Sequence, residues 1–135
     1  PNGSRHTMAY TLALDGRTVL RQDRQIKADG SAEDTAAAAM WWNAARGKVA
    51  FRFLSSNGLS AMGEMVSLTV DGDTSTMVVR FRGSTGDGVG LAATLTQVLK
   101  GDTMEISFSD VSRQDRSSLP DVSGDPMIFK RIGNN

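Results

Sequence analysis

Apolar and polar residues alternate with a period of two along much of the chain, as expected for strands that bury one face of a sheet. In residues 77–82 and 104–109, apolar side chains occupy one parity, while charged or hydroxyl side chains fill most of the other. Residues 8–14 and 48–53 follow the same rule, and residues 127–131 resemble a short closing strand. The pattern predicts a protein built mainly from β-strands.

Turn signals separate these segments at a nearly even spacing. They are Asp15-Gly16, Asp29-Gly30, Arg46-Gly47, Asn57-Gly58, Asp71-Gly72, Gly86-Asp87-Gly88 and Gly101-Asp102. Asp-Gly and Asn-Gly favour tight hairpins, because the central residues of a type I′ turn need positive φ. The signals therefore predict about eight strands in which neighbours along the chain pair antiparallel.

Residues 31–46 fit two interpretations. The alanine run, Ser31 with Asp34 three residues later, and Gly47 after the segment are typical of a capped helix. The length and position of the segment instead fit one more strand, joined by a hairpin to residues 49–54. We predict a strand, because pairing with neighbouring strands often overrides intrinsic propensity.

The predicted fold is all-β, an antiparallel up-and-down meander closing into a barrel of about 8–10 strands. Closure is favoured because it removes exposed strand edges. A β-sandwich is the alternative. A chain of 135 residues has room for one core, which we assign to a single domain over residues 8–132. We interpret residues 1–7, which hold the only histidine, His6, as a tag remnant or disordered terminus without a functional role.

Composition narrows the function classes. Fifteen Lys and Arg balance fifteen Asp and Glu, so the chain lacks the basic surplus of a dedicated nucleic-acid binder. The absence of cysteine excludes disulfides, thiolate metal sites and a cysteine nucleophile. No apolar run approaches the roughly 18 residues of a membrane span, so we expect no membrane insertion. We expect no cofactor or metal, and the compartment stays open, with the cytoplasm slightly favoured.

Catalytic motifs are scarce. The chain has no Gly-x-Ser-x-Gly nucleophile motif, and His6 is the sole imidazole available as a base. The glycine-rich residues 83–90 lack the Gly-Lys-Ser/Thr ending of a phosphate-binding loop. We therefore expect no catalysis.

Glu64 is the candidate polar group of a site. It alternates in phase with Met62, Val66 and Leu68, which suggests a carboxylate on an apolar face. Desolvation there would oppose its ionisation, so it could anchor a ligand or act as an acid or base. The structural alternatives are a position at the barrel mouth, an ion pair with Arg80 or Arg82 on a nearby strand, or a bulge at Gly63 that turns Glu64 outward.

Arginines on the second strand and the tryptophan pair have two interpretations each. Arg17, Arg21 and Arg24 cluster on the second strand, and Arg80 and Arg82 lie on another. An arginine that points inward could bind the carboxylate of a fatty acid or a similar anion. The alternative is a solvated strand face with cross-strand partners such as Asp23. Trp41 and Trp42 must point to opposite faces of a strand. We expect one in the core and the other in contact with solvent, a loop or a partner subunit.

Several segments resemble a known group. Residues 41–49, Trp-Trp-Asn-Ala-Ala-Arg-Gly-Lys-Val, are similar to the aromatic-Asn/Asp-x-x-x-Gly-Lys hairpin of lipocalin-like bacterial β-barrels of the calycin group, many of them domains of unknown function. Residues 55–63, 101–105 and 127–131 are similar to later turns and the closing strand of these barrels. The opening Gly-x-Trp strand of the group is not visible before Met8. The resemblance implies either an apolar cavity for a small ligand or a packed barrel with an interaction role.

The functional hypothesis is binding of a small hydrophobic or amphipathic molecule inside the barrel. A packed protein-interaction module, which could form a homodimer, is the second hypothesis, and a calycin-type isomerase or cyclase using Glu64 and an arginine is the third. The predicted ligand-binding residues are Tyr10, Leu12, Trp41, Trp42, Phe51, Phe53, Glu64, Val66, Leu68, Val79, Phe81, Leu95 and Phe108.

Overall fold

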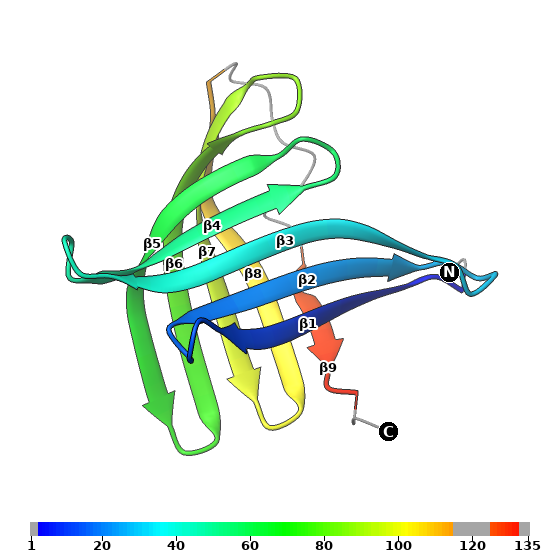
Figure 1. Cartoon of the computed structure of the whole chain (residues 1–135), viewed down its shortest axis with the longest axis horizontal. Coiled ribbons are helices and arrows are strands. Elements are labelled where there is room, and N and C mark those ends of the chain that lie inside the picture. Colours follow the sequence, from blue (N-terminus) through cyan, green and yellow to red (C-terminus); the bar gives the residue numbers. More distant parts are fainter. Residues whose placement is uncertain (1–2, 115–124, 133–135) are drawn as a thin grey trace.

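The fold consists of β-strands alone over the described part of the chain. The computed structural model describes residues 3–114 and 125–132. The strands are β1 (Arg5–Ala13), β2 (Thr18–Ile26), β3 (Ala32–Asn43), β4 (Lys48–Ser55), β5 (Ser60–Asp71), β6 (Thr74–Ser84), β7 (Gly90–Lys100), β8 (Thr103–Arg113) and β9 (Met127–Lys130). Each pairs antiparallel with the next along the chain, in the spatial order β1 to β9 (Figure 1). The prediction of an all-β up-and-down meander is confirmed.

The predicted turns connect the strands. Each contains a glycine with positive φ, for example 78° at Gly16 and 58° at Gly72. This left-handed conformation costs a glycine little, whereas a Cβ would strain it. The glycines that mark the turns in the sequence therefore also determine where the strands begin and end.

The alanine-rich segment forms strand β3 and not a helix. Its residues pair with β2 on one side and with β4 on the other, from Ala32 to Asn43. Ala38 is buried on the concave face, whereas its neighbour Ala37 is exposed on the opposite face. Two flanking strands thus satisfy the backbone of this segment and outweigh the helix propensity of alanine.

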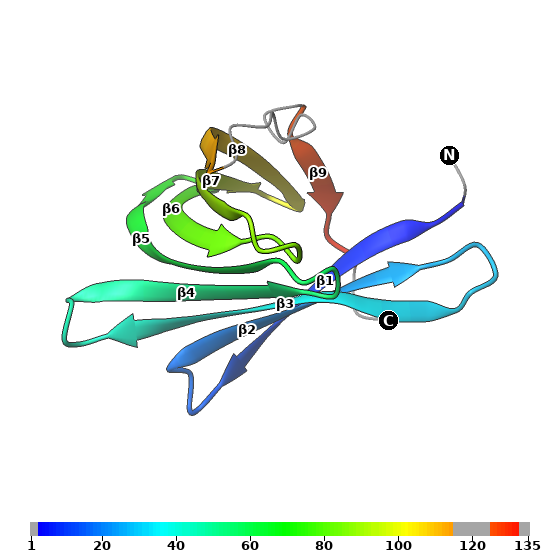
Figure 2. The same ribbon diagram turned by 90° about the horizontal axis from the view of Figure 1, so that it is seen from above.

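The sheet is continuous and strongly curved, so the meander forms a half-barrel. Strands β1 to β4 make one side, and β5 to β9 curl back over it (Figure 2). A β-bulge at Met65–Ser67 and the close approach of Gly63 to Phe81 accompany the curvature in β5. Among the described strands β1 and β9 do not pair with each other, so closure stops short of a hydrogen-bonded barrel.

Strand β1 begins at Arg5, inside the segment 1–7 that we interpreted as a terminus without a role. Residues 5–7 pair with residues 24–26 of β2. This pairing brings His6 onto the same face as Met8 and Tyr10, because side chains two apart share a face. The imidazole therefore belongs to the concave side of the half-barrel.

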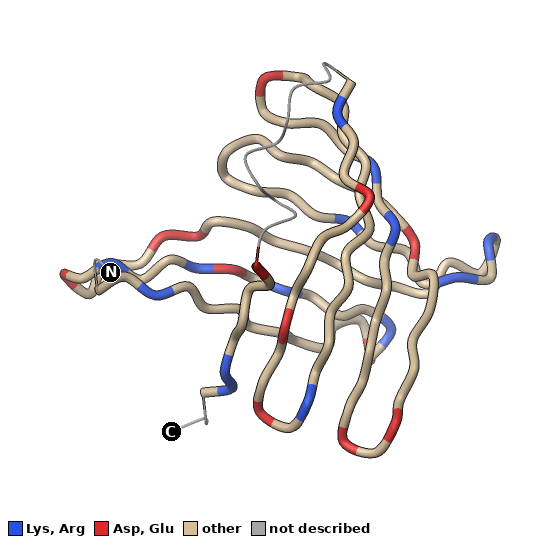
Figure 3. Tube along the Cα trace, turned by 180° about the vertical axis from the view of Figure 1, so that it is seen from behind, with Lys and Arg blue, Asp and Glu red and all other residues tan. Residues whose placement is uncertain are grey.

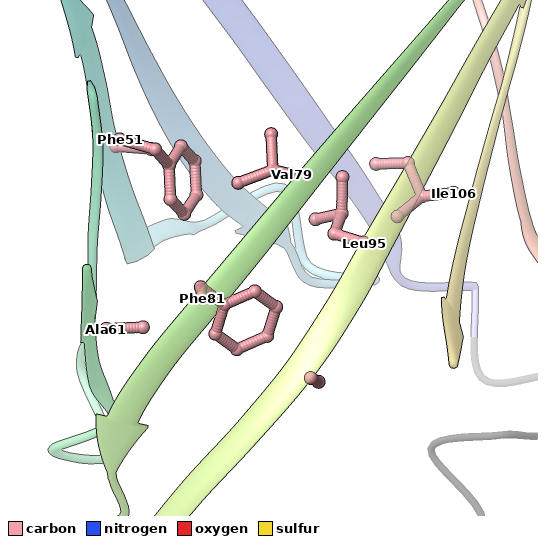
Figure 4. Packing of buried hydrophobic residues seen from close by; sticks show 8 residues of the cluster. Phe51, Ala61, Val79, Phe81, Leu95 and Ile106 are labelled. Atoms are coloured by element: carbon pink, nitrogen blue, oxygen red, sulfur yellow. The ribbon is translucent and has the colours of Figure 1, made fainter. Parts of the chain in front are cut away.

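The core occupies the concave side of β3 to β8. Val79 is 0% exposed and Ile106 is 2% exposed. Figure 4 shows the labelled side chains of this cluster gathered on one side of the sheet. The buried members are Ala38, Phe51, Ala61, Val79, Phe81, Ala93, Leu95 and Ile106.

Candidate ligand-binding cavity

A cavity of about 650 Å³ lies on the concave face between the two sides of the half-barrel. Its volume falls in the range of roughly 300–1,000 Å³ that is usual for small-molecule sites. The wall is mostly apolar and comes from every part of the sheet. The lining residues are His6, Met8, Arg21, Asp23, Thr35, Ala36, Phe51, Phe53, Leu59, Ala61, Phe81, Leu95, Ile106, Phe108, Met127, Ile128 and Phe129.

Five of the residues predicted to bind a ligand line this cavity. They are Phe51, Phe53, Phe81, Leu95 and Phe108. The rings of Phe81 and Phe108 meet edge to face, with centroids 6.2 Å apart and planes at 84°. The fully buried Val79 packs in the same cluster without facing the cavity. Alternation along β4, β6 and β8 was enough to find the four phenylalanines.

Tyr10 lies beside the cavity, in a small recess next to Arg21 and Phe51. Its hydroxyl lies 3.7 Å from the sulfur of Met104 on β8. Burial raises the pKa of Tyr10, and the nearby Arg21 guanidinium only partly offsets this. Tyr10 therefore connects β1 with β8 across the gap between the two sides of the sheet.

Four other predicted residues lie away from the cavity and are largely solvent-exposed. Leu12 is 70% exposed, Trp42 61%, Leu68 57% and Val66 53%. Strands β4 and β5 pair only over Ala50–Leu54 and Ser60–Glu64, so the second half of β5 leaves the first side of the sheet. The bulge next to Val66 also ends the simple alternation. Side chains of β5 beyond the bulge are therefore no longer covered by the first side of the sheet.

The tryptophan pair does not contribute to the buried core. Trp42 lies on the same face of β3 as Met40, but at the open end of the strand. Trp41 lies on the opposite face and is 37% exposed. The expectation that one of the two enters the core is wrong, because the pair sits at the β3–β4 hairpin, outside the region that β5 to β8 cover.

Glu64 lies on the outer face and is not among the lining residues of the cavity. It pairs with Arg46, whose Nη2 is 3.2 Å from Oε2, and with Lys48, whose Nζ is 3.6 Å from the same oxygen. The hydrogen bond from Arg46 lowers the pKa of Glu64, although desolvation opposes this effect. The expected desolvated acid is thus a stabilised carboxylate. Its partners come from the β3–β4 hairpin and β4, not from Arg80 or Arg82.

The polar group of the cavity is instead an ion pair between Arg21 and Asp23. The Nε of Arg21 donates to Oδ1 of Asp23 at 2.6 Å, and Nη2 donates to Oδ2. Asp23 is 2% exposed, which makes it the one buried charged residue in the described part of the chain. Both residues lie on the concave face of β2, because they are two positions apart. The sequence interpretation placed Asp23 only on a solvated face, although a charged residue in phase with Val19 was an available signal of burial.

The surroundings of Arg21 favour its charged form. Burial acts against the Arg21 charge, but the hydrogen bond and charge of Asp23 outweigh it and raise the pKa of Arg21. The guanidinium also lies over the ring of Phe53, 5.7 Å from its centroid. His6 places Nε2 3.6 Å from Oδ2 of Asp23. The cavity therefore contains a fixed ion pair with an imidazole at its edge.

A hydroxyl without a partner lies beside this ion pair. The register between β2 and β3 passes from Asp23–Ala36 to Arg24–Asp34, so Thr35 is the extra residue of a β-bulge. Its Oγ1 is buried and has no hydrogen-bond partner among the described residues. Because Thr35 lines the cavity, a bound molecule whose polar end reaches this hydroxyl would supply the partner that it lacks.

Charged side chains elsewhere in the described chain form no further site of this kind. Acidic and basic residues are interspersed over the strands and hairpins (Figure 3). No cluster of three or more His, Asp or Glu side chains suited to a metal ion occurs within residues 3–114 and 125–132. Over the same residues, no helix is long and apolar enough to cross a membrane.

Fold and site together define an all-β half-barrel with an apolar internal cavity and a buried ion pair at the cavity wall. Comparison of the chain with protein-family models, curated proteins and solved structures yields no match. The function must therefore be inferred from the geometry of this cavity.

Proposed function

We propose that the protein binds a small hydrophobic or amphipathic molecule in the concave cavity and releases it unchanged. The observation that carries this proposal is an apolar space of about 650 Å³ with a few convergent polar groups at its wall. The aromatic side chains of the wall provide contact area for the ligand, while Arg21, Asp23 and Thr35 orient its polar group. The lipocalin-like barrels that the hairpin motifs resemble would hold a ligand in the same place.

The position of Glu64 does not support a calycin-type isomerase or cyclase that works through this residue. Glu64 lies outside the cavity and is held by Arg46 and Lys48. A carboxylate whose pKa is lowered by two cations is also a poor proton donor or acceptor near neutral pH. The cavity is better explained by a protein that binds and carries a ligand without changing it chemically.

The test uses a fluorescent apolar probe and two neighbouring alanines. N-phenyl-1-naphthylamine is neutral and fluoresces more strongly in an apolar site. Ala36 lines the cavity, whereas Ala37, the next residue of β3, is exposed on the outer face. We expect saturable probe binding at one site per chain, at least tenfold weaker in Ala36→Phe and unchanged in Ala37→Phe. Equal binding by both variants, or no saturable binding, would contradict the proposal.

Homodimerisation through the open side of the half-barrel is the second candidate function. Leu12, Trp42 and Leu68 are each more than half exposed there, and β1 and β9 are free edges within the described sheet. Exposed apolar clusters and free edges are typical of interaction surfaces. Light scattering after size-exclusion chromatography tests this: a dimer that Leu68→Glu converts to a monomer supports it, and a monomeric wild type excludes it.

A further inference from the structure

We propose that the cavity selects ligands whose polar end is uncharged, such as a long-chain alcohol, over carboxylates and amines of the same length. This inference rests on the proposed function and specifies the class of molecule that the site takes. It follows from the charges at the cavity wall and from the free hydroxyl beside them.

The charges at the wall cancel. Among the lining residues that the structure describes, the ionisable side chains are Arg21, Asp23 and His6. The Arg21 guanidinium and the Asp23 carboxylate are joined by two hydrogen bonds, so neither has a full counter-charge left for a ligand. A buried charge needs such a partner to offset the loss of its water. Neither residue of this ion pair therefore offers such a partner to a charged ligand.

Each kind of charged ligand would also meet an unfavourable neighbour. A carboxylate placed against Arg21 would lie close to the 2%-exposed carboxylate of Asp23. An ammonium group placed against Asp23 would lie close to the guanidinium of Arg21. We expected an inward arginine to bind a fatty-acid carboxylate. Arg21 is not suited to this, because Asp23 already accepts the hydrogen bonds from two of its guanidinium nitrogens.

An uncharged hydroxyl has suitable partners in the same place. A hydroxyl both donates and accepts, and Thr35 Oγ1 is buried at the wall with no partner among the described residues. The guanidinium keeps N–H groups that Asp23 does not use, and the carboxylate keeps lone pairs. A ligand alcohol can thus satisfy Thr35 and one member of the ion pair without bringing a charge into the cavity.

The experiment compares ligands that differ only at the polar end. 1-Decanol, decanoate and decylamine are titrated against the protein loaded with N-phenyl-1-naphthylamine at pH 8.5, where a carboxylic acid and an alkylamine are both charged. We expect decanol to displace the probe at a concentration at least tenfold lower than either charged analogue. Equal or tighter displacement by decanoate or decylamine would overturn the selectivity and leave cavity binding intact. Failure of the probe itself to bind would overturn the proposed function and this inference together.

Two substitutions connect the selectivity to the named groups. Thr35→Val removes the free hydroxyl at similar volume, and we expect decanol affinity to fall at least threefold, with recovery in Thr35→Ser, which keeps a hydroxyl. Asp23→Asn uncovers the guanidinium and should shift the preference towards decanoate. An unchanged decanol affinity in Thr35→Val overturns the assignment of Thr35, and this test does not depend on whether Asp23→Asn folds.

Discussion

The imidazole ring of His6 on β1 lies 6.0 Å from the ring of Phe129 on β9, with the two planes tilted by 59°. These strands are the two ends of the meander, and the described residues show no backbone pairing between them. The ring contact, together with the approach of Tyr10 to Met104, therefore spans the gap where a closed barrel would have a ladder of hydrogen bonds. Over the described residues, side-chain contacts, and not backbone hydrogen bonds, therefore join the two ends of the sheet at this seam.

Removal of the Phe129 ring should open the seam. The side chain is half-buried, so we expect Phe129→Ala to lower the free energy of unfolding by about 1–3 kcal/mol, less than a fully buried phenylalanine would cost. Urea denaturation measures this, and probe binding should weaken at the same time because Phe129 lines the cavity. Lys130→Ala, which changes the exposed neighbour, is the control. Equal stability of the two variants would contradict a closing role for the ring.

The buried ion pair on β2 should respond differently from an exposed ion pair between β2 and β3. Asp23→Ala leaves the Arg21 guanidinium buried without a partner, so we expect a loss of about 3–5 kcal/mol in the free energy of unfolding. The double substitution Arg21→Met with Asp23→Leu removes both charges and should recover most of that loss.

The matched control for the ion pair is Arg24 with Asp34. These side chains are also joined by a hydrogen bond, of 2.6 Å, but are 53% and 55% exposed. Asp34→Ala should cost about 0–1 kcal/mol, because water screens an exposed pair. Urea unfolding of the variants gives the comparison. Similar losses for Asp23→Ala and Asp34→Ala would show that burial of the first pair has no energetic effect.

The sequence was sufficient for the fold because its signals are local. Glycine turns set the hairpins, and the alternation of residues 77–82 and 104–109 set the concave face of β6 and β8. Even the alanine-rich residues 31–46 were assigned correctly, once the pairing of neighbouring strands was weighed against helix propensity. The extent of closure was less accessible, because it depends on how far β1 and β9 approach through contacts distant in the sequence.

The candidate site was predictable only in part. Aromatic residues such as Phe51 and Phe81 follow the alternation, so their place in the cavity was found. Glu64 was misplaced on an apolar face because Met62 is on the exposed outer side and a bulge follows at Met65–Ser67. The bulge at Thr35 and the burial of Asp23 depend on how the strands pack together. The alternation of apolar and polar residues along the sequence does not carry this information.

Gly63 should resist substitution because its partner on β6, Phe81, approaches it closely. A Cβ at this position would lie 2.8 Å from both Cα and Cβ of Phe81, closer than side-chain carbons normally approach. We expect Gly63→Ala to lower the free energy of unfolding by about 1–3 kcal/mol through displacement of β6. Met62→Ala, at a 57%-exposed neighbour on the outer face, should change it by less than about 0.5 kcal/mol. Urea denaturation of both proteins checks the contrast, which a stable Gly63→Ala would contradict.

The ion pair at Glu64 should make stability depend on acid pH. Its hydrogen bond from Arg46 lowers the pKa of Glu64 in the folded state, so folding favours the ionised carboxylate. The contribution is therefore complete above the pKa of an unfolded glutamate, about 4.3, and is lost as the pH falls through the lower folded value. We expect Glu64→Gln to melt at a lower temperature than the wild type at pH 7, and this difference to shrink as the pH falls below the pKa of an unfolded glutamate. Glu105→Gln, at an exposed position of β8, is the control, and a difference at Glu64 that persists unchanged at low pH would contradict the ion-pair account, because protonation would then have removed nothing.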